Sequence, residues 1–212
     1  METEKERRAR SNWIPVLNGQ LRAAGAPGEK GFARMIGDTG TTKVVTLLNE
    51  GESDQRPVGK WCKDHEVGWI HIPLSGGRLE TEEDCKQLCR LVEVRNVLDA
   101  GERVLVHCSA GMHRTGVAMY TILRHCGFEP EAALKAVEQS RILTYEELVK
   151  QRKKIMEGKR LVDLAEEHFQ LHFKPLDPSP APAPAAIAGT ATATKEPAAA
   201  VVATPAAAAA AA

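Results

Sequence analysis

Apolar and polar positions follow two periods along the chain, one typical of strands and one typical of helices. Short apolar runs, most of them rich in β-branched residues, predict extended segments, at residues 12–16, 43–49, 67–72 and 104–106. Longer stretches with helical spacing predict helices, at residues 32–36, 58–66, 81–99, 117–125, 130–139, 144 onward and 161–173. Because strands alternate with helices, the pattern predicts an α/β fold, a mostly parallel sheet covered by helices on both faces.

Local signals place the ends of several helices. Thr81 precedes three acidic residues and is typical of an N-cap, and Ala100 with Gly101 ends that helix near Asp99. Pro130 suits a first helical turn. Thr144 followed by Glu147 predicts a capping box for the next helix.

Composition divides the chain of 212 residues into three parts. Residues 1–11 form a charged N-terminal extension with no apolar stretch, so they predict neither a secretory signal nor a membrane anchor. Residues 12–174 have the length and apolar content of one compact domain. Residues 175–212 are rich in Pro, Ala and Thr and lack aromatic residues, which predicts a disordered tail.

Charge and cysteine content exclude several classes of function. Lys and Arg together number 28, as do Asp and Glu, so no overall basicity favours nucleic acid or a membrane surface. No apolar run is long enough to span a membrane. The five cysteines, at positions 62, 85, 89, 108 and 126, lack metal-ligand spacing, so no metal or other cofactor is expected. These features predict a cytoplasmic, monomeric protein.

Two of the cysteines and three histidines late in the chain are expected to be structural. Cys85 and Cys89 stand four apart on a predicted helix and are interpreted as packed thiols rather than a redox pair. His125, His168 and His172 are interpreted as surface or capping residues rather than ligands.

Residues 104–116 carry the chemistry. A strand runs into Cys108, five residues separate it from Arg114, and a helix follows. A loop between a strand and a helix N-terminus aims backbone N–H groups at one point, which favours an anion and stabilises thiolate over thiol. Arg114 offers a planar fork for two phosphate oxygens. Gly111 and Gly116 let the backbone approach the ligand closely.

Two other interpretations of this segment stay open from the residues alone. Cys108 could be a buried structural cysteine, with Arg114 paired to a carboxylate elsewhere in the chain. Sulfur carriers similar to rhodanese also hold a cysteine in an anion-binding loop, but they lack the Arg-Thr-Gly exit into a helix.

The string HCSAGMHRTG, at residues 107–116, resembles the signature loop of the cysteine-dependent protein tyrosine and dual-specificity phosphatases. The resemblance implies that Cys108 attacks phosphorus, that Arg114 binds the phosphoryl oxygens, and that Thr115 assists the sulfur as leaving group. It further implies that His107 supports the loop. Backbone donors would come from the residues between the two catalytic groups, Ser109, Ala110, Gly111, Met112 and His113, and from Arg114 itself.

The general acid of this family is absent from its usual place. The family carries an Asp on a loop that follows a strand upstream of the Cys, but here that loop, residues 72–80, has Ser75 and Gly76 where the Asp is expected. Glu80 is the nearest carboxylate and the candidate acid, and Asp64 is an alternative. Without an acid, good leaving groups such as aryl phosphates or phosphoanhydrides become favoured.

The resemblance leaves three functions open. The leading one is a protein tyrosine phosphatase, with phosphoserine and phosphothreonine as further substrates, because Ser109, Ala110 and Met112 are uncharged. A second is a phosphatase for phosphoinositides or inositol pyrophosphates, since His113 before Arg114 resembles the Lys-His-Arg arrangement of the latter group. Arg78 and Arg141 would add charge for such a polyanion, or are solvated surface residues. A third is a phosphate-binding pseudophosphatase.

Overall fold

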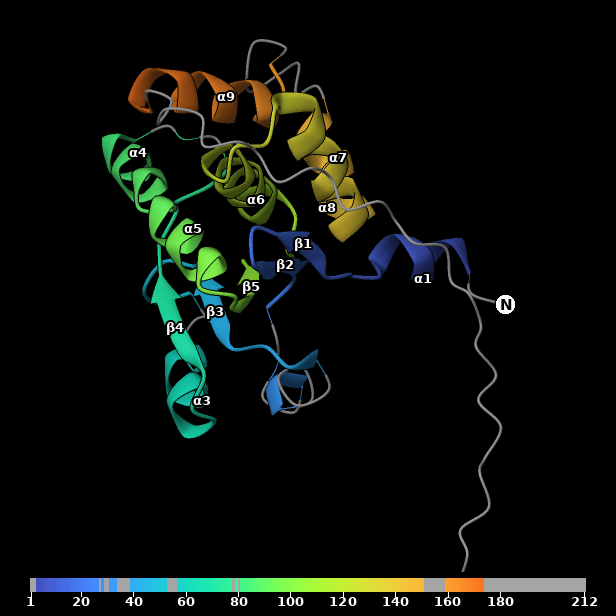
Figure 1. Cartoon of the computed structure of the whole chain (residues 1–212), viewed down its shortest axis with the longest axis vertical. Helices are drawn as coiled ribbons and strands as arrows, with labels where there is room; N and C mark the ends of the chain where they lie inside the picture. The colour runs from blue at the N-terminus through green and yellow to red at the C-terminus, as the bar shows by residue number, and fades with distance from the viewer. Residues whose placement is uncertain are drawn as a thin grey trace, which may run out of the picture. The chain divides into compact units, whose positions relative to one another are not determined.

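A computed structural model of the chain describes residues 3–26, 28, 31–33, 39–52, 57–77, 79, 81–150 and 159–173. Its centre is a sheet with the strand order β1-β2-β5-β3-β4 (Figure 1). The strands are β1 (Ile14–Val16), β2 (Gly19–Ala24), β3 (Lys43–Thr46), β4 (Gly68–His71) and β5 (Arg103–His107). Only the β1–β2 pairing in this sheet is antiparallel. The predicted α/β fold with a mostly parallel sheet is confirmed.

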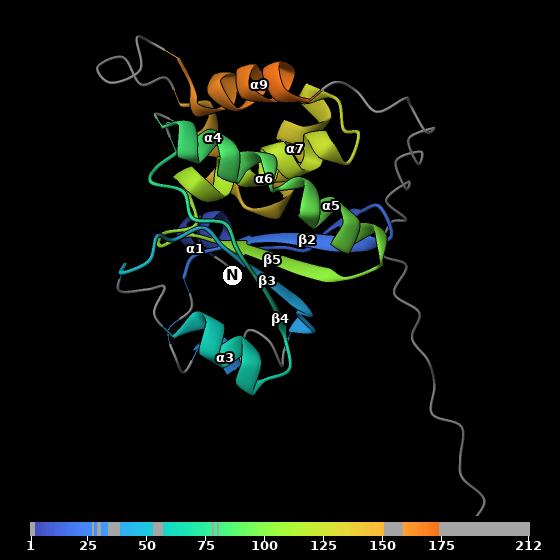
Figure 2. The same cartoon turned by 90° about the vertical axis from the view of Figure 1, so that its left-hand side faces the viewer.

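Helices cover both faces of the sheet, with most of them on one side. In Figure 2, α4, α5, α6, α7 and α9 lie on one side of the strands and α3 lies on the other. The described helices are α1 (Glu4–Ala9), α3 (Val58–Asp64), α4 (Glu82–Cys89), α5 (Val92–Asp99), α6 (His113–His125), α7 (Pro130–Ser140), α8 (Ile142–Val149) and α9 (Leu161–His172).

The two faces of the central strands contribute to two apolar clusters. Val104 and Val106 of β5 belong to the larger cluster, whereas Leu105 belongs to the smaller one with Val58 and Cys62 of α3. This division follows from the pleat, since successive side chains of a strand point to opposite faces. The end of β5 is therefore fixed from both sides, and the loop that follows it starts from a rigid position.

Several elements differ from the sequence-based prediction, and α1 is one that it did not include. Strand β2 was not predicted, because its residues are weak strand formers, although Leu21 and Ala23 alternate as buried positions. The single helix predicted over residues 81–99 is wrong, because the chain forms α4 and α5 instead. At the junction the amide of Leu91 bonds to the carbonyl of Leu88, and this tighter turn buries the Leu91 side chain completely.

Several expectations fall partly or wholly outside the described residues. Residues 31–33 are helical, as predicted, but 34–38 are not described. The predicted tail, 175–212, is not described either. Within the described part of the chain, no helix has the length and apolar character needed to cross a membrane.

Histidine and phenylalanine rings gather where α9 packs on α6. The ring of His125 meets that of Phe173 edge-on, with centroids 4.0 Å apart, and lies 5.3 Å from Phe169. His168 is only 5% exposed, so its predicted surface position is wrong. The ring is buried because it lies on the apolar face of α9 together with its neighbours.

This ring cluster predicts a loss of stability in mild acid. Burial, with Arg95 and His168 nearby, lowers the pKa of His125 from 6.5 to about 4. The lowered pKa favours the neutral ring in the folded state. The contribution of His125 to the free energy of unfolding is therefore complete above pH 6.5 and is lost as the pH falls toward 4. Urea titrations are expected to show a drop of up to about 3 kcal/mol in the free energy of unfolding from this group.

His125→Phe keeps an aromatic ring at that position and should reduce the slope of stability against pH between pH 6.5 and 4. His65→Phe, at an exposed position after α3, is the matched control and should leave the slope unchanged. Equal slopes in the wild-type and His125→Phe proteins would contradict the assignment.

Candidate active site

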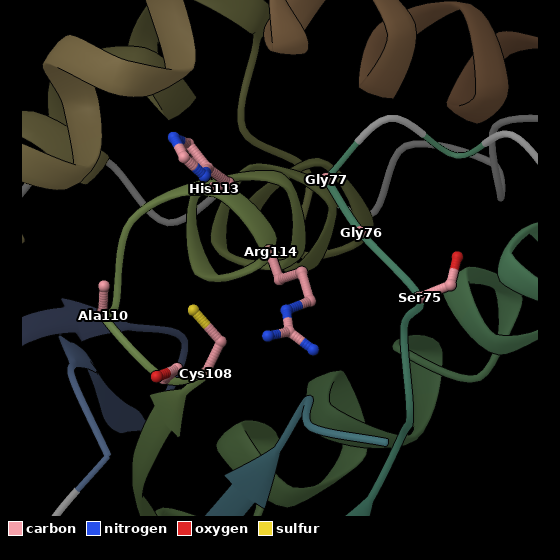
Figure 3. Close-up of a pocket in the computed structure, with 8 residues that line it drawn as sticks. Ser75, Gly76, Gly77, Cys108, Ala110, His113 and Arg114 are labelled. Carbon is pink, nitrogen blue, oxygen red and sulfur yellow. The ribbon is translucent and has the colours of Figure 1, made fainter. Parts of the chain in front are cut away.

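Cys108 lies directly after β5, and its loop returns to the N-terminus of α6 at His113. The cysteine is 4% exposed. Figure 3 shows its sulfur inside the loop with the guanidinium of Arg114 beside it. Both residues line a pocket of about 270 Å³, whose walls are Ser75, Gly76, Gly77, Cys108, Ser109, Ala110, His113 and Arg114. This volume suits a small polar group rather than a drug-sized ligand.

Three carbonyls of the loop, those of Ser109, Ala110 and Gly111, are held from outside. The amide of Ala26 donates to Ser109 O at 2.7 Å, and the Arg141 guanidinium donates to Ala110 O at 2.9 Å and to Gly111 O at 2.8 Å. In a trans peptide the N–H points opposite to the C=O. The amides of Ala110, Gly111 and Met112 therefore point inward, toward the space above the Cys108 sulfur, where an oxyanion would accept from them.

Arg141 and Thr144 were not predicted to hold the loop. The hydroxyl of Thr144 donates to Gly111 O at 2.6 Å. The capping box predicted at this residue is wrong, since α8 begins at Ile142 with no side-chain cap and Thr144 lies inside it. Burial lowers the pKa of Arg141, so the interpretation as a solvated surface residue does not hold.

Gly111 is required at its position for a steric reason. Its φ is +67°, and a Cβ there would collide with the backbone of Ala24 and with the Arg141 guanidinium. A side chain would therefore push away the donors that orient the loop. The sequence-based expectation that Gly111 lets the backbone approach a ligand stays a prediction, because the close neighbours here are Ala24 and Arg141.

The guanidinium of Arg114 is anchored on one edge. Its Nη1 donates to Glu52 Oε1 at 2.6 Å and to the carbonyl of Leu74 at 3.1 Å, and its Nη2 donates to Glu52 Oε2 at 2.9 Å. The guanidinium has five hydrogens. The hydrogen on Nε and the second hydrogen on Nη2 lie on the edge that does not face Glu52. That edge can bind two phosphoryl oxygens in a bidentate manner.

The Glu52–Arg114 pair also fixes the charges of both groups. The hydrogen bond from Arg114 holds the pKa of Glu52 below its ordinary value, although partial burial opposes it. The same bond raises the pKa of Arg114, and Cys108 contributes in the same direction. Sequence reasoning missed Glu52; the available signal was its place in the loop after β3, the strand that pairs with β5.

Glu52→Gln is expected to lower kcat/KM for an aryl phosphate. An amide cannot accept both guanidinium donors, so the fork loses its orientation, and we expect a loss of about 10- to 100-fold. Steady-state kinetics, with inorganic phosphate as a competitive inhibitor, would measure the loss together with weaker phosphate binding. Glu50→Gln, at an exposed neighbouring position, is the control. Unchanged phosphate inhibition would contradict this role for Glu52.

A hydrogen-bonded chain supports the loop from beneath. The indole N–H of Trp69 donates to Thr46 Oγ1 at 2.9 Å, and Thr46 Oγ1 lies 2.9 Å from His107 Nε2. Because an indole can only donate, the Thr46 hydroxyl is free to give its hydrogen to Nε2. His107 then carries its proton on Nδ1, which faces the carbonyl of Cys108 at 3.3 Å.

Thr115 lies in the first turn of α6 and is completely buried. Its hydroxyl has no hydrogen-bond partner among the residues described. A hydroxyl that is buried and unpaired can donate to a sulfur anion when one forms nearby. The role that the family resemblance implies for Thr115 stays a prediction.

The facing loop offers no acid in its described residues. Ser75 donates through its amide to Asp84 Oδ1 at 2.7 Å and through its hydroxyl to Oδ2, while Gly76 and Gly77 have no side chains. Asp84 is 2% exposed. Burial opposes its ionisation, but hydrogen bonds from Ser75 and Thr81 hold its pKa below the ordinary value, so Asp84 is no proton donor at neutral pH.

The predicted candidates for the acid are not brought to the site by the described structure. Glu80 and Arg78 lie outside the described residues. Asp64 pairs with Lys60 on α3 and does not line the pocket. In the described part of the chain, no group of three or more His, Cys, Asp or Glu residues could hold a metal ion.

His113 is the other titratable residue of the pocket wall besides Cys108 and Arg114. Its Nε2 lies 3.0 Å from Oε2 of Glu147 on α8. Burial opposes ionisation of Glu147, but hydrogen bonds from His113 and Lys150 hold its pKa below the ordinary value. An anionic carboxylate therefore faces the imidazole.

Comparisons with known proteins bear on the fold and the family of the chain. No curated protein matches the chain in sequence. Solved structures share the fold. Tk-PTP in its active form has a TM-score of 0.52 and 22% identity, covering 70% of this chain and 92% of the other. PTPMT1 in complex with PI(5)P has a TM-score of 0.53 and 18% identity, covering 75% of this chain and 97% of the other. A putative phosphatase from Shewanella putrefaciens has a TM-score of 0.52 and 19% identity, covering 82% of this chain and 99% of the other.

The family comparison covers most of the chain. Residues 8–167 match the family described as PTP-SAK, the Swiss Army Knife protein DSP-PTPase phosphatase domain. That range contains the Cys108 loop, the Glu52 anchor and the helices that support them. The chain therefore belongs to this family and is a phosphatase of the DSP/PTP superfamily.

Proposed function

We propose that this phosphatase hydrolyses phosphate monoesters through a phosphocysteine at Cys108, with phosphotyrosine on proteins as its leading substrate. One observation carries the proposal. The sulfur of Cys108, the inward amides of its loop and the open edge of Arg114 converge on one pocket. A tetrahedral oxyanion placed there meets a nucleophile on one side and donors on the others.

The reaction consists of two displacements at phosphorus. In the first, the Cys108 thiolate forms a bond to phosphorus as the bond to the leaving oxygen breaks, and the leaving oxygen takes up a proton. In the second, water attacks phosphorus, the S–P bond breaks, and phosphate departs as the thiolate forms again. Arg114 and the loop amides stabilise the charge on the equatorial oxygens in both steps.

Charge around the pocket supports a substrate with one phosphoryl group. In the described wall of the pocket, Arg114 pairs with Glu52 and His113 faces Glu147, so each of these two basic side chains has an acidic neighbour. Ser109 and Ala110 add no charge to the pocket wall. A phosphotyrosine side chain needs one oxyanion site and a way in for an apolar ring, and Gly76 and Gly77 add no side chains to the pocket wall.

A second candidate is a phosphatase for inositol pyrophosphates or phosphoinositides. It is favoured by the facing loop, whose described residues carry no acid, because a phosphoanhydride needs less protonation of its leaving group. It also agrees with the shared fold of PTPMT1, which was solved with PI(5)P. For this chain the phosphoprotein substrate remains the preferred proposal.

A substrate panel tests the proposal. The full chain should release phosphate from p-nitrophenyl phosphate in the presence of EDTA and be inhibited by vanadate. Acid quenching during turnover should trap a phosphoryl group on the peptide that contains Cys108. We expect higher kcat/KM for phosphotyrosine peptides than for inositol pyrophosphates or phosphoinositides. The reverse order would establish the second candidate, and no turnover of any substrate would indicate a pseudophosphatase.

A further inference from the structure

We propose that Arg22 and Arg103 form a second oxyanion site, separate from the Cys108 pocket, that binds inorganic phosphate or the phosphoryl group of a small phosphorylated molecule. The two arginines lie on neighbouring strands of the sheet, β2 and β5 (Figure 1). Turnover at Cys108 does not require this site, and the site does not require turnover.

Both side chains lie on the face of the sheet that α3 packs against. Arg103 shares that face with Leu105, because alternate residues of a strand point to the same side, and Leu105 belongs to the apolar cluster that includes α3. Arg22 is the register partner of Leu105 and lies on the same face. Arg103 begins β5, so its Cα lies about 13 Å from that of His107, at about 3.3 Å per residue. Neither arginine lines the pocket of Cys108, which lies beyond the other end of the strand.

The two guanidinium groups meet at the indole ring of Trp13. The guanidinium carbon of Arg103 lies 4.8 Å from the ring centroid, and that of Arg22 lies 5.6 Å from it. Glu102 is next to Arg103 in sequence but points to the opposite face, where it lies 4.0 Å from Lys43. In the part of the chain that the structure describes, no carboxylate pairs with either arginine. Two positive charges therefore share one aromatic ring without a described counterion.

Arg22 is held in place and is affected by the charge of Arg103. Its Nε donates to Ser11 Oγ at 2.8 Å, and the same hydroxyl donates to the carbonyl of Ala23. Burial lowers the pKa of Arg22, and the neighbouring Arg103 lowers it further. A bound anion would act in the opposite direction, because it supplies the negative charge that the pair of cations needs.

The cluster also has more hydrogen-bond donors than acceptors. Arg103 Nε and Trp13 Nε1 are buried and have no hydrogen-bond partner among the described residues. Buried donors are paired in nearly all folded proteins, so two unpaired donors at one place point to a ligand that accepts hydrogen bonds. Among the same residues, the terminal nitrogens of both arginines have no acceptor either, and they are not sealed from solvent. These terminal nitrogens are the groups that an entering anion would meet.

A phosphate dianion fits this arrangement better than a carboxylate. Its charge balances two guanidinium groups, and its tetrahedral oxygens can accept from forks carried by two different strands. A carboxylate carries one charge and binds a single fork in its own plane. We therefore infer a ligand of the phosphate type.

The competing explanation is that both arginines only pack on Trp13. To separate the two, one equivalent of vanadate first fills the Cys108 pocket of the full chain, and inorganic phosphate is then titrated. The readout is the indole N–H signal of Trp13 in a proton–nitrogen correlation spectrum, assigned with Trp13→Phe among the three tryptophans of the chain. We expect this signal to move to saturation with phosphate, while those of Trp61 and Trp69 stay in place. A Trp13 signal that does not move would overturn the proposal.

Arg22→Gln and Arg103→Gln each remove one cation and keep a polar side chain. We expect each to weaken phosphate binding at this site by about 10- to 100-fold, the size of a lost charge-assisted hydrogen bond, while kcat for p-nitrophenyl phosphate stays near wild type. Arg90→Gln is the matched control, because Arg90 is paired with Glu93 at 3.1 Å, and it should leave binding unchanged. Equal phosphate binding in the Arg103→Gln and Arg90→Gln proteins would overturn the proposal. The other two indole signals report whether each variant is folded.

A second probe identifies the source of the phosphoryl group. Inositol hexakisphosphate should move the Trp13 signal at a lower concentration per phosphate group if the ligand is a polyphosphorylated molecule, and at an equal one if it is free phosphate. Movement that persists unchanged in both arginine variants would place binding elsewhere and overturn the proposal. If the chain turned over no substrate, the proposed function would fail, while these titrations would still decide the second site.

Discussion

Cys108→Ser is expected to abolish turnover, with a loss in kcat of about 10⁴-fold or more, of the size seen when a covalent nucleophile is removed. A serine hydroxyl in the same loop is a far weaker nucleophile than a thiolate, because the field of the loop amides and the α6 N-terminus does not suffice to ionise it. The inward amides of Ala110, Gly111 and Met112 remain. Phosphate affinity, measured by isothermal titration calorimetry, should therefore stay within a few-fold of wild type.

Cys85→Ser is the matched control for this substitution. Burial raises the pKa of Cys85, with Asp84 and Glu82 acting in the same direction, so this thiol is not activated. The control should retain full activity. Turnover by the Cys108→Ser protein at more than about 1% of the wild-type rate would refute the assignment of the nucleophile.

Arg114→Lys is expected to cost about 10³-fold in kcat, or about 4 kcal/mol of transition-state stabilisation. The guanidinium uses one edge for Glu52 and keeps the other for the phosphoryl group, and a lysine ammonium cannot serve two edges at fixed geometry. Glu52 would then hold the ammonium away from the substrate. Stopped-flow measurement of the first turnover would show a slower phosphoryl transfer step.

The same helix offers a control for Arg114→Lys. Arg124, also in α6, binds both carboxylate oxygens of Glu166 of α9, with Nε at 2.9 Å and Nη2 at 3.1 Å from them. Arg124→Lys should lower thermal stability and leave kcat near wild type. If both lysine variants lost activity equally, the loss would reflect the packing of α6 rather than phosphoryl binding.

The order of elements and the reactive loop could be predicted because both depend on local sequence. The apolar runs in β3, β4 and β5 are longer than those found in turns, so these strands can be recognised locally. Cys108, Gly111 and Arg114 all lie within one strand–loop–helix segment. Strand β2 escaped prediction because its strand character comes from pairing with β5 rather than from its own residues.

The partners of the loop were decided by tertiary structure. Glu52 is 62 positions from Arg114, and Arg141 is 31 positions from the Ala110 carbonyl that it holds. Neither pairing leaves a local pattern, because it depends on which strand ends and helix starts the parallel sheet brings to one edge. Thr144 shows the same limit, since its sequence context fits a helix cap and the fold uses its hydroxyl on Gly111 instead.

The sequence by itself predicted which atoms would do the chemistry, a thiol and a guanidinium at fixed separation on one short loop. Only the tertiary structure decided how that loop is held, because its carbonyls must be bound from outside before its amides can face inward. Donors for those carbonyls come from the segment after β2, the start of α8 and the residue before α8. Their convergence follows from the packing of the sheet and helices as a whole, which no single segment specifies.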